Sequence, residues 1–329
     1  MSDSGSILVI RLSSLGDVLL CAPTMRALRN RFPEARIDFL VASQFEEAAK
    51  LLPGIDQIIV FNKNEGWRGL LRLRRLLSRR YEIIVDLQNS LRSAFLRTFC
   101  FPLLWSKASR YRFRRWLLIR FKKNYYKKVL PVPLRYVDSV DTFGAKDDGL
   151  GLELVNIDTD PDTTRKNLVI LCPGAKHATK KWPKENWKTL AESIKESGFT
   201  LVVCGVQSEA EVCREIAGDG EVWIDAPLAH IGALMKSSAA VVCHDSGLMH
   251  LATGVGARTV ALFGPTVEEF GFFPFRGRSI VLQQQLACRP CSAFGADKCP
   301  LHHHNCMRLT TPDNVMQALR EVSSRHDHE

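Results

Sequence analysis

The fold of this chain is decided by two short stretches, ILVIRLSSLGDV at residues 7–18 and AVVCHDSGLMH at residues 240–250. Each begins with an apolar run typical of a buried strand, continues into a small polar turn and ends where a helix can start. Such a turn offers free backbone N–H groups and the positive end of a helix, and both suit an anionic ligand. One such turn in each half predicts two nucleotide-binding folds facing one cleft, with chemistry between them.

The segments around these turns alternate between strand and helix patterns. In the first half we predict strands at residues 7–10, 37–41, 58–61 and 83–86, and helices at residues 18–31, 45–52, 67–80 and 138–144. In the second half we predict strands at residues 168–171, 200–204, 240–243, 259–263 and 280–282, and helices at residues 185–197, 209–217, 230–236 and 311–322. This alternation favours an α/β protein with two Rossmann-like domains, whose parallel sheets face a central cleft.

The pattern also predicts domain limits. We assign residues 1–160 to a first Rossmann-like domain and residues 161–310 to a second, with residues 311–329 forming a C-terminal helix and tail. The length of 329 residues and the 46% apolar content suit two ordinary domains. We expect no secretory leader, and no uncharged run reaches the roughly 18 residues that a spanning helix needs. The ten cysteines include Cys172, Cys204 and Cys243 in strand-like runs, which predicts reduced thiols in the cytoplasm.

The positive charge is local. Of 45 basic and 35 acidic residues, 13 basic and no acidic residues lie in the basic segment, residues 87–137, leaving 32 against 35 elsewhere. Aromatic residues such as Trp105, Trp116 and Phe121 are interleaved with these cations. Such a patch predicts an anionic partner, and we favour a membrane surface or an acidic glycolipid. Single-stranded nucleic acid is the alternative, but no RNA-binding signature accompanies the segment, so we expect no nucleic acid.

The first turn contains a candidate general base. Gly16 permits a tight turn and a close ligand approach, and Asp17 follows at the predicted start of a helix. A carboxylate there can remove the proton of a hydroxyl nucleophile, although the same position is common for ordinary helix capping. The turn contains neither the G-x-G-x-x-G fingerprint of dinucleotide-binding proteins nor the Gly-Lys-Ser/Thr of a P-loop.

Two loops of the second half are candidate phosphate sites. The loop PGAKHATKKWP at residues 173–183 contains three lysines that can neutralise a diphosphate leaving group, although it also reads as a solvated cationic loop. In the second turn, Ser246 and Gly247 present backbone N–H groups to phosphate oxygens, and His250 follows on the first turn of the next helix. A lone histidine is more often structural than a ligand.

A cysteine cluster lies near the C-terminus. Cys288, Cys291, Cys299 and Cys306 enclose a run of three histidines, and these residue types suit zinc or iron. The spacing is compressed relative to common zinc ribbons. We therefore favour a buried loop packed by free cysteines and predict no metal.

Taken together, these motifs resemble the lipopolysaccharide heptosyltransferases of glycosyltransferase family 9, over nearly the whole chain. The resemblance rests on the following residues: Ser13 to Val18, Pro173 to Ala175, Lys181 to Pro183, Gly205 with Glu209, Asp245 to His250, Leu262 to Thr266, and the cysteine cluster from Cys288 to Met307. It implies a GT-B fold, and transfer of L-glycero-D-manno-heptose from ADP-heptose to the inner core of lipopolysaccharide, with inversion and without a metal or other cofactor.

The resemblance also implies roles for individual residues. Asp17 matches the catalytic base and Lys181 the diphosphate-binding lysine. The remaining matches are substrate-binding positions: Ser13, Ser14, Gly16, Thr179, Glu209 (ribose), Asp245, Ser246, Gly247, Leu248 and His250. The implied acceptor is Kdo-lipid A or a heptosylated inner-core glycolipid, reached from the cytoplasmic face of the inner membrane by a peripherally bound enzyme. The basic segment would dock it, which makes the first domain the acceptor-binding one and the second the ADP-sugar-binding one.

Two alternatives stay open at this point. One is a family 9 transferase that moves another sugar or modifies a protein. The other is a non-catalytic protein that binds an anionic surface through the basic segment, and such a protein has no need of Lys181 together with the turn at residues 245–250.

Overall fold

The computed structural model describes residues 5–78, 80–100, 102–158 and 167–324. Contacts divide the chain into two compact units: residues 1–110 with 132–156, and residues 111–131 with 157–329. The predicted boundary between residues 160 and 161 lies outside the described residues, and the division by contacts falls between Asn156 and Ile157. Residues 111–131, which the sequence placed in the first domain with the rest of the basic segment, group with the second unit.

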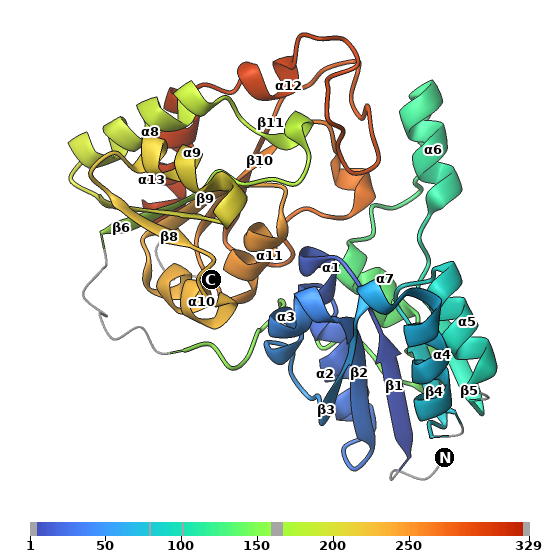
Figure 1. The fold of residues 1–329 in the computed structure, drawn as a ribbon. Coiled ribbons are helices and arrows are strands. Elements are labelled where there is room, and N and C mark those ends of the chain that lie inside the picture. Colours follow the sequence, from blue (N-terminus) through green and yellow to red (C-terminus); the bar gives the residue numbers. More distant parts are fainter. Residues whose placement is uncertain (1–4, 79, 101, 159–166, 325–329) are drawn as a thin grey trace. The chain divides into compact units, whose positions relative to one another are not determined.

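The first unit contains a parallel sheet of five strands in the order β3-β2-β1-β4-β5 (Figure 1). Its strands are β1 (Ser6–Ile10), β2 (Arg36–Ala42), β3 (Gln57–Phe61), β4 (Ile83–Asp86) and β5 (Leu104–Lys107). Its helices are α1 (Leu15–Leu19), α2 (Ala22–Arg31), α3 (Glu46–Lys50), α4 (Gly66–Leu77), α5 (Leu91–Phe99) and α7 (Val132–Asp138), with short 3₁₀ turns at Ser43–Phe45, Lys63–Glu65 and Asp141–Phe143.

Both faces of this sheet are covered. Leu8 and Ile10 of β1 belong to an apolar cluster with Leu70 of α4 and Leu96 of α5. Successive side chains of a strand point to opposite faces, and the intervening Val9 is also fully buried. A parallel sheet buried on both sides is the expected result of strand–helix alternation.

The second unit contains a parallel sheet of six strands in the order β11-β10-β9-β6-β7-β8. Its strands are β6 (Leu168–Cys172), β7 (Thr200–Gly205), β8 (Glu221–Ile224), β9 (Ala240–His244), β10 (Thr259–Phe263) and β11 (Ser279–Gln283). Its helices are α6 (Arg112–Phe121), α8 (Lys184–Glu196), α9 (Ala210–Ala217), α10 (Leu228–Ser237), α11 (Gly247–Gly254), α12 (Asn305–Arg308) and α13 (Pro312–Ser324), with 3₁₀ turns at Ala178–Lys180, Gln207–Glu209 and Glu268–Phe270.

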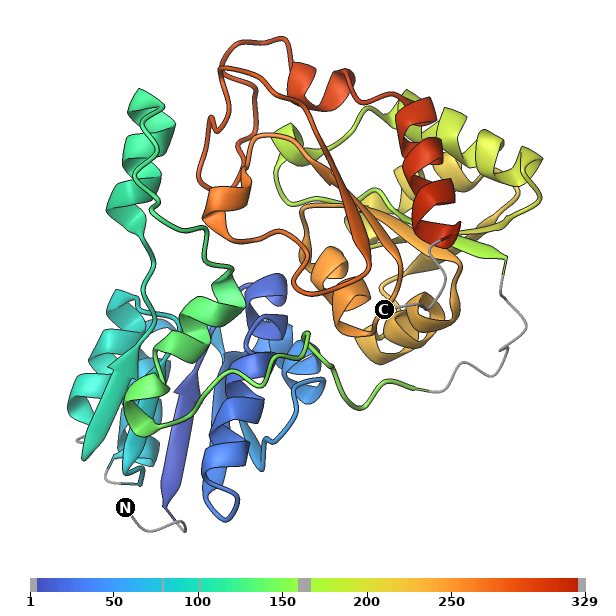
Figure 2. The ribbon, with the colours of Figure 1, turned by 180° about the vertical axis from the view of Figure 1, so that it is seen from behind.

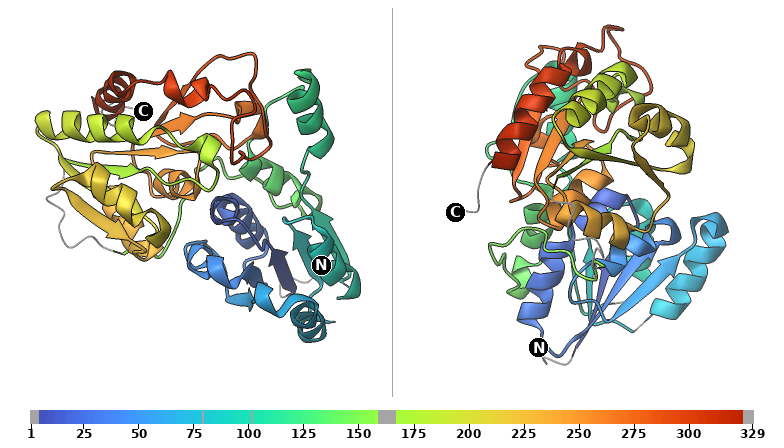
Figure 3. Two further views of the ribbon diagram at one scale, coloured as in Figure 1. Left: turned by 45° about the horizontal axis from the view of Figure 1, so that its top comes forward. Right: turned by 90° about the vertical axis from the view of Figure 1, so that its left-hand side faces the viewer.

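This sheet is likewise covered on both sides. Val169 and Leu171 of β6 belong to an apolar cluster with Trp187 of α8 and Leu319 of α13. Helices α8 and α13 lie on one face and α11 on the other, as Figures 1 and 2 and the left view of Figure 3 show. Among the described residues, no helix combines the length and the apolar character needed to cross a bilayer.

Several sequence-based limits were wrong in detail. The helix predicted at residues 18–31 is interrupted between α1 and α2, and the helix predicted at residues 45–52 begins as a 3₁₀ turn. Of the helix predicted at residues 67–80, α4 ends at Leu77, and residue 79 lies outside the described residues. The short helix predicted at residues 138–144 is a 3₁₀ turn, Asp141–Phe143, and the true helix is α7, just before it.

The basic segment is not one element. The sequence missed α5 and β5, which belong to the first sheet and its cover, as well as α6. Arginines lie between the apolar residues of α5, so its sequence does not show a clear apolar face. An arginine can occupy such a position because its long stem covers apolar surface while its charge stays in water. The sequence also missed β8, a four-residue strand at the sheet edge that is nowhere fully buried.

Each sheet has one point at which the strand order reverses. In the first sheet the chain leaves β1 in one direction for β2 and β3, and returns on the other side for β4 and β5. In the second sheet the corresponding point lies between β6 and β9. Ligands of open α/β sheets bind outside the carboxyl ends of the strands at such points. The turn after β1 and the turn after β9 therefore lie where a ligand site is expected.

Candidate active site

In the first unit, Asp17 lies in the first turn of α1, beyond the carboxyl end of β1. Ser14 and not Asp17 is the N-cap, and Asp17 Oδ2 accepts hydrogen bonds from the Ser14 N–H at 3.2 Å and the Ser14 hydroxyl at 2.8 Å. The other oxygen, Oδ1, lies 2.8 Å from Arg11 Nη2 and accepts from the Tyr136 hydroxyl at 3.3 Å. Four donors from three residues therefore surround this one carboxylate.

These neighbours keep Asp17 charged. Burial alone would raise the pKa of Asp17, but the positive charge of Arg11 and the hydrogen bonds from Ser14 outweigh it, so the pKa is lowered. Burial also raises the pKa of Tyr136, so its phenol stays a neutral donor. Arg11 and Asp17 are only 7% and 18% exposed. The group that the sequence singled out as a base is thus an ionised carboxylate in a confined setting.

The residues around Asp17 shape the turn. Gln88, which follows β4, accepts hydrogen bonds through Oε1 from the N–H groups of Leu12 and Ser13 at 2.9 and 3.2 Å. This contact ties the two sides of the switch point together. Gly16 is buried in α1, and its φ is not positive. The tight turn that we expected at Gly16 is therefore not the reason for a glycine at this position.

In the second unit, the turn after β9 exposes a helix start and leaves one hydroxyl unused. Ser246 is the N-cap of α11 and Gly247 its first residue, with Leu248 and His250 in the first turns. Ser246 Oγ is buried and has no hydrogen-bond partner among the described residues. A buried hydroxyl without a hydrogen-bond partner costs about 1–3 kcal/mol of free energy, and a ligand oxygen that accepted its hydrogen bond would remove this cost.

A lysine that the sequence did not single out reaches this turn. Lys180 Nζ lies 2.5 Å from Asp245 Oδ2 and donates to the Asp245 carbonyl at 3.2 Å. Asp245 also accepts from the Thr266 hydroxyl at 2.7 Å. Lys181, the lysine that the resemblance implied, is 46% exposed and lies 3.5 Å from Glu209. Because Lys180 and Lys181 are adjacent lysines in one loop, their different partners could not be predicted from the sequence.

Glu209 lies directly against the turn after β6. Its carboxylate is so close to Gly174 that a Cβ at position 174 would overlap it. Only a glycine leaves room for the carboxylate there. The structure thus brings Glu209, Lys181 and the turn after β6 together, at the same sheet edge as Asp245.

Thr179 and His244 have structural partners. The Thr179 hydroxyl donates to the Ala296 carbonyl at 3.0 Å and accepts from the Ala296 N–H at 2.8 Å, so it ties this loop to the cysteine segment. His244 is fully buried and accepts from the Trp182 N–H at 2.8 Å. Burial lowers the pKa of His244 to about 3, which leaves the ring neutral. These contacts hold the lysine loop against β9.

The four clustered cysteines are free thiols. Among the described residues, no group of three or more histidine, cysteine or acidic side chains is arranged to hold a metal ion. Burial and the neighbouring thiols raise the pKa of Cys291, and raise the pKa of Cys306 to about 11. In this arrangement the cysteines do not fit a common metal position, and no chemical step is assigned to them. The adjacent Arg289 holds the turn after β10, donating to the carbonyls of Gly264 and Thr266 at 2.5 and 2.7 Å.

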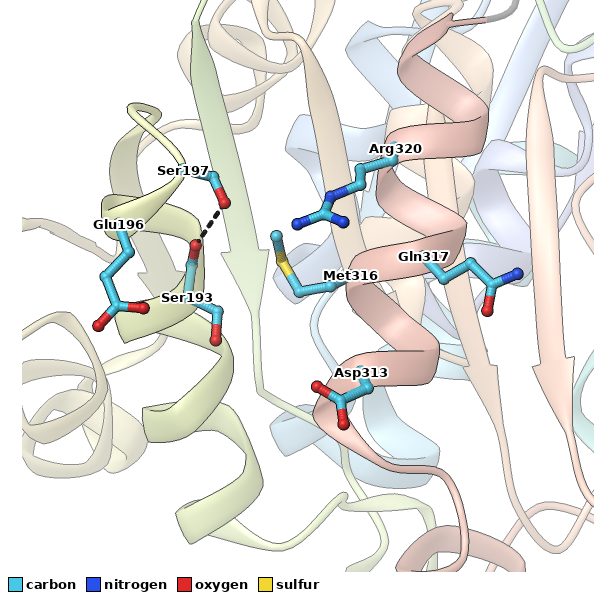
Figure 4. A pocket seen from close by; sticks show the side chains of 7 residues that line it. All are labelled: Ser193, Glu196, Ser197, Asp313, Met316, Gln317 and Arg320. Atoms are coloured by element: carbon cyan, nitrogen blue, oxygen red, sulfur yellow. Dashed lines mark hydrogen bonds between the residues drawn. The ribbon is translucent and has the colours of Figure 1, made fainter.

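A hollow of about 320 Å³ lies between α8 and α13 (Figure 4). It is lined by Ser193, Glu196, Ser197, Asp313, Met316, Gln317 and Arg320. It adjoins the end of α8, just before β7 begins, and so lies towards the amino ends of the strands. Ligands bind at the opposite edge in sheets of this kind, and the candidate site residues are all at that edge.

Comparison with known proteins identifies the family of this chain. Residues 70–299 match the model of glycosyltransferase family 9 (heptosyltransferase). The chain is 27% identical over 318 residues to lipopolysaccharide heptosyltransferase 1 of Pseudomonas aeruginosa, covering 87% of this chain and 85% of the relative. It is 26% identical over 327 residues to lipooligosaccharide heptosyltransferase 2 of Campylobacter jejuni, covering 94% and 95%.

Solved structures show the same fold. The E. coli heptosyltransferase WaaC with ADP-2-deoxy-2-fluoro heptose has a TM-score of 0.73 and 18% identity, covering 96% of this chain and 99% of that one. The iron-containing dodecameric glycosyltransferase TibC from enterotoxigenic E. coli has a TM-score of 0.61 and 14% identity, covering 98% and 77%. The predicted fold of two Rossmann-like α/β domains of the GT-B type is confirmed. The matched region exceeds half of the sequence, and the chain belongs to glycosyltransferase family 9, the heptosyltransferases.

Proposed function

We propose that this protein is an inverting ADP-heptose:lipopolysaccharide heptosyltransferase that adds L-glycero-D-manno-heptose to a Kdo or heptose residue of the inner core. Family membership and the names of the relatives support heptosyl transfer in lipopolysaccharide assembly. The ADP-heptose analogue held by WaaC supports ADP-heptose as the donor. The observation that carries the proposal is the turn after β9 at the switch point between β6 and β9, where α11 begins and the buried Ser246 hydroxyl has no partner among the described residues.

The chemistry of that turn suits the diphosphate of the donor. The N–H groups at the start of α11 and the unused Ser246 hydroxyl are donors for phosphate oxygens. Lys181, half exposed, supplies a positive charge, and Lys180 holds the Asp245 turn in place. In this proposal Glu209 accepts hydrogen bonds from the ribose hydroxyls, because an ionised carboxylate is a strong acceptor for a diol.

At the anomeric carbon the reaction breaks one bond and forms one, and one proton moves from the acceptor hydroxyl to Asp17. The acceptor hydroxyl oxygen bonds to C1 of heptose on the face opposite the ADP, the bond from C1 to the phosphate oxygen breaks, and the configuration at C1 inverts. Negative charge develops on the departing ADP, where Lys181 and the turn amides stabilise it. The acceptor hydroxyl gives its proton to Asp17.

Asp17 must exchange a donor before it can accept that proton. A carboxylate offers about four acceptor positions, and the four donors described above fill them. The Ser14 hydroxyl belongs to an exposed residue and can rotate away, and the Tyr136 contact is the longest of the four at 3.3 Å. We propose that the acceptor hydroxyl replaces one of these two, while Arg11 stays in place.

We further propose that the transfer requires no metal or other cofactor. The lysines and amides of the second unit supply the positive charge that a metal ion supplies in many other phosphate sites. The test is activity after exhaustive chelation, together with metal analysis of the purified protein. Lost activity that returns with iron or zinc would refute this part of the proposal, and TibC shows that an iron-containing glycosyltransferase can have this fold.

The proposed acceptor also implies where in the cell the enzyme acts. Kdo-lipid A and its heptosylated form are anionic glycolipids, and we propose that the protein meets them as a peripheral protein at the cytoplasmic face of the inner membrane. The basic segment, with 13 cations and no acids, supports an anionic surface as its partner.

The test is a transfer assay with purified protein, ADP-heptose, and either Kdo-lipid A or its monoheptosylated form. We expect mass spectrometry to show one added heptose on one of the two acceptors, and NMR to show the inverted anomeric configuration. Asp17→Asn should abolish transfer while ADP binding stays near wild type, and it should lower thermal stability because the buried Arg11 loses its charged partner. Retention of configuration, or full activity of Asp17→Asn, would refute the mechanism.

A further inference from the structure

Helix α6 has two faces of opposite character, although the sequence suggests only a uniform run of cations and aromatics. One face, with residues 115, 118 and 122 at helical spacing, contacts the rest of the second unit. The other, with residues 112, 113, 116 and 120 and with Phe121 at the helix end, is exposed. This arrangement shows which side chains hold the helix in place and which remain available for a partner.

The contacting face is firmly attached. The Arg115 guanidinium lies over the rings of Phe270 and Phe294, at 5.1 and 5.0 Å from their centroids. Just beyond the helix, Lys122 Nζ donates to the carbonyls of Cys288 and Pro290, at 2.8 and 2.5 Å. Leu118 between them is buried. Helix α6 therefore runs beside the cysteine segment, as Figures 1 and 2 show, and it is fixed to the unit that we propose to bind the donor.

The exposed face presents aromatic rings to solvent. Phe113, Trp116 and Phe121 are 69%, 51% and 50% exposed. Phe113 stacks on Trp116 at 5.9 Å, and Trp116 meets Phe121 edge-on at 5.4 Å, so the three rings form one continuous apolar ridge. Arg112 and Arg120 flank the ridge, and Lys123 follows it.

We propose that this exposed face of α6 is a membrane anchor, whose aromatic ridge inserts into the headgroup region of a bilayer containing anionic phospholipid. Interfacial helices combine an apolar face carrying Trp and Phe with flanking cations in this way. Aromatic side chains of this kind favour the membrane–water interface, and each cation near an anionic leaflet strengthens binding.

Charge complementarity selects the partner. The segment from Leu87 to Val137 contains no acidic residue that could repel an anionic surface. A bilayer accepts three adjoining rings and the cations beside them without requiring a specific pocket. The proposal rests on the proposed function only in expecting that the acceptor lies in a membrane. Its test is independent of that function, because binding to lipid is measured without donor or acceptor.

The experiment is cosedimentation of the full-length protein with vesicles of phosphatidylcholine, with and without phosphatidylglycerol. We expect binding only to the anionic vesicles, and weakening by salt. Phe113→Ala with Trp116→Ala should reduce partitioning at least tenfold, by the loss of two half-exposed rings that insert. Arg112→Gln with Arg120→Gln should reduce it about 25-fold, since each cation is worth roughly fivefold near such a surface.

Two further variants make the result specific to α6. Trp67→Ala removes another exposed tryptophan, on α4 and 65% exposed, and should bind vesicles as wild type does. Trp116→Phe should keep binding but lose most of the tryptophan quenching caused by brominated lipids, which reports insertion of that ring. ADP binding should be unchanged in all four variants.

Two outcomes would overturn the proposal: undiminished vesicle binding by the Phe113/Trp116 variant, or binding of the wild type to anionic vesicles that is no greater than its binding to neutral ones. Tight binding of single-stranded RNA in place of vesicles would assign the face to a nucleic acid instead. Failure here leaves heptosyl transfer to a detergent-dispersed acceptor intact. Failure of the proposed function would instead remove transfer while vesicle binding remains.

Discussion

The contact between Gly174 and Glu209 allows the donor site to be tested with a single added methyl group. A Cβ at position 174 would meet the Glu209 Cδ at 2.9 Å, about half an ångström inside ordinary van der Waals contact, and would overlap the carboxylate oxygen Oε2 more severely. Because the obstacle is the end of a flexible side chain, Gly174→Ala should fold, with the carboxylate displaced. The 3.5 Å ion pair with Lys181 is half exposed, so its loss should cost only about 0–1 kcal/mol of stability.

The effect on donor binding should be much larger. Hydrogen bonds to a charged group contribute about 1.5–3 kcal/mol each. If Glu209 holds the ribose, displacing its carboxylate should weaken ADP binding about 10- to 100-fold, since 1.4 kcal/mol corresponds to tenfold. Isothermal titration of ADP into wild type, Gly174→Ala, Glu209→Ala and the double variant measures this directly.

The double variant is the internal control. Once the carboxylate is absent, the methyl group has nothing to displace, so Gly174→Ala should add nothing to Glu209→Ala. Wild-type affinity in Gly174→Ala, or full additivity of the two substitutions, would show that the reasoning about Glu209 is wrong.

Three other predictions follow from buried ionisable groups. Arg11→Gln removes the cation that lowers the pKa of Asp17, so the acid limb of the kcat–pH profile should move to higher pH; an unchanged limb would argue against Asp17 as the base. His244 has a folded pKa of about 3 against about 6.5 unfolded, so stability should fall as pH drops below 6.5, by about 2 kcal/mol at pH 5, and urea unfolding of His244→Gln should lose this dependence. Lys180→Met leaves the carboxylate of Asp245 without its cation and should lower the unfolding free energy by about 3–5 kcal/mol, measured by urea denaturation, with a change under 1 kcal/mol contradicting this.

Local signals in the sequence were enough for the turns but not for their partners. The turns after β1 and β9 were predictable because a buried strand, a small polar turn and a helix start are contiguous. Tyr136 lies 119 residues from Asp17 and Thr266 lies 21 residues from Asp245, and nothing in either sequence pattern links them. Such contacts arise only when α7 and β10 are placed beside the sheet edge.

The choice between adjacent lysines illustrates the same limit. Residues 178–180 form a 3₁₀ turn, which directs Lys180 towards Asp245, while Lys181 is extended and turns towards Glu209. Neighbouring side chains point in different directions once the backbone is fixed, and composition alone cannot predict that direction. The resemblance emphasised Lys181 in this loop, and the geometry adds Lys180 as a second candidate.

The central claim is that the second unit binds ADP-heptose. The most direct test is isothermal titration of the purified protein with ADP-heptose, with UDP- and GDP-sugars as controls and Lys181→Ala as the matched variant. We predict saturable binding of ADP-heptose alone, and weaker binding by Lys181→Ala. Equal binding of all three nucleotide sugars, or binding of none, would contradict it.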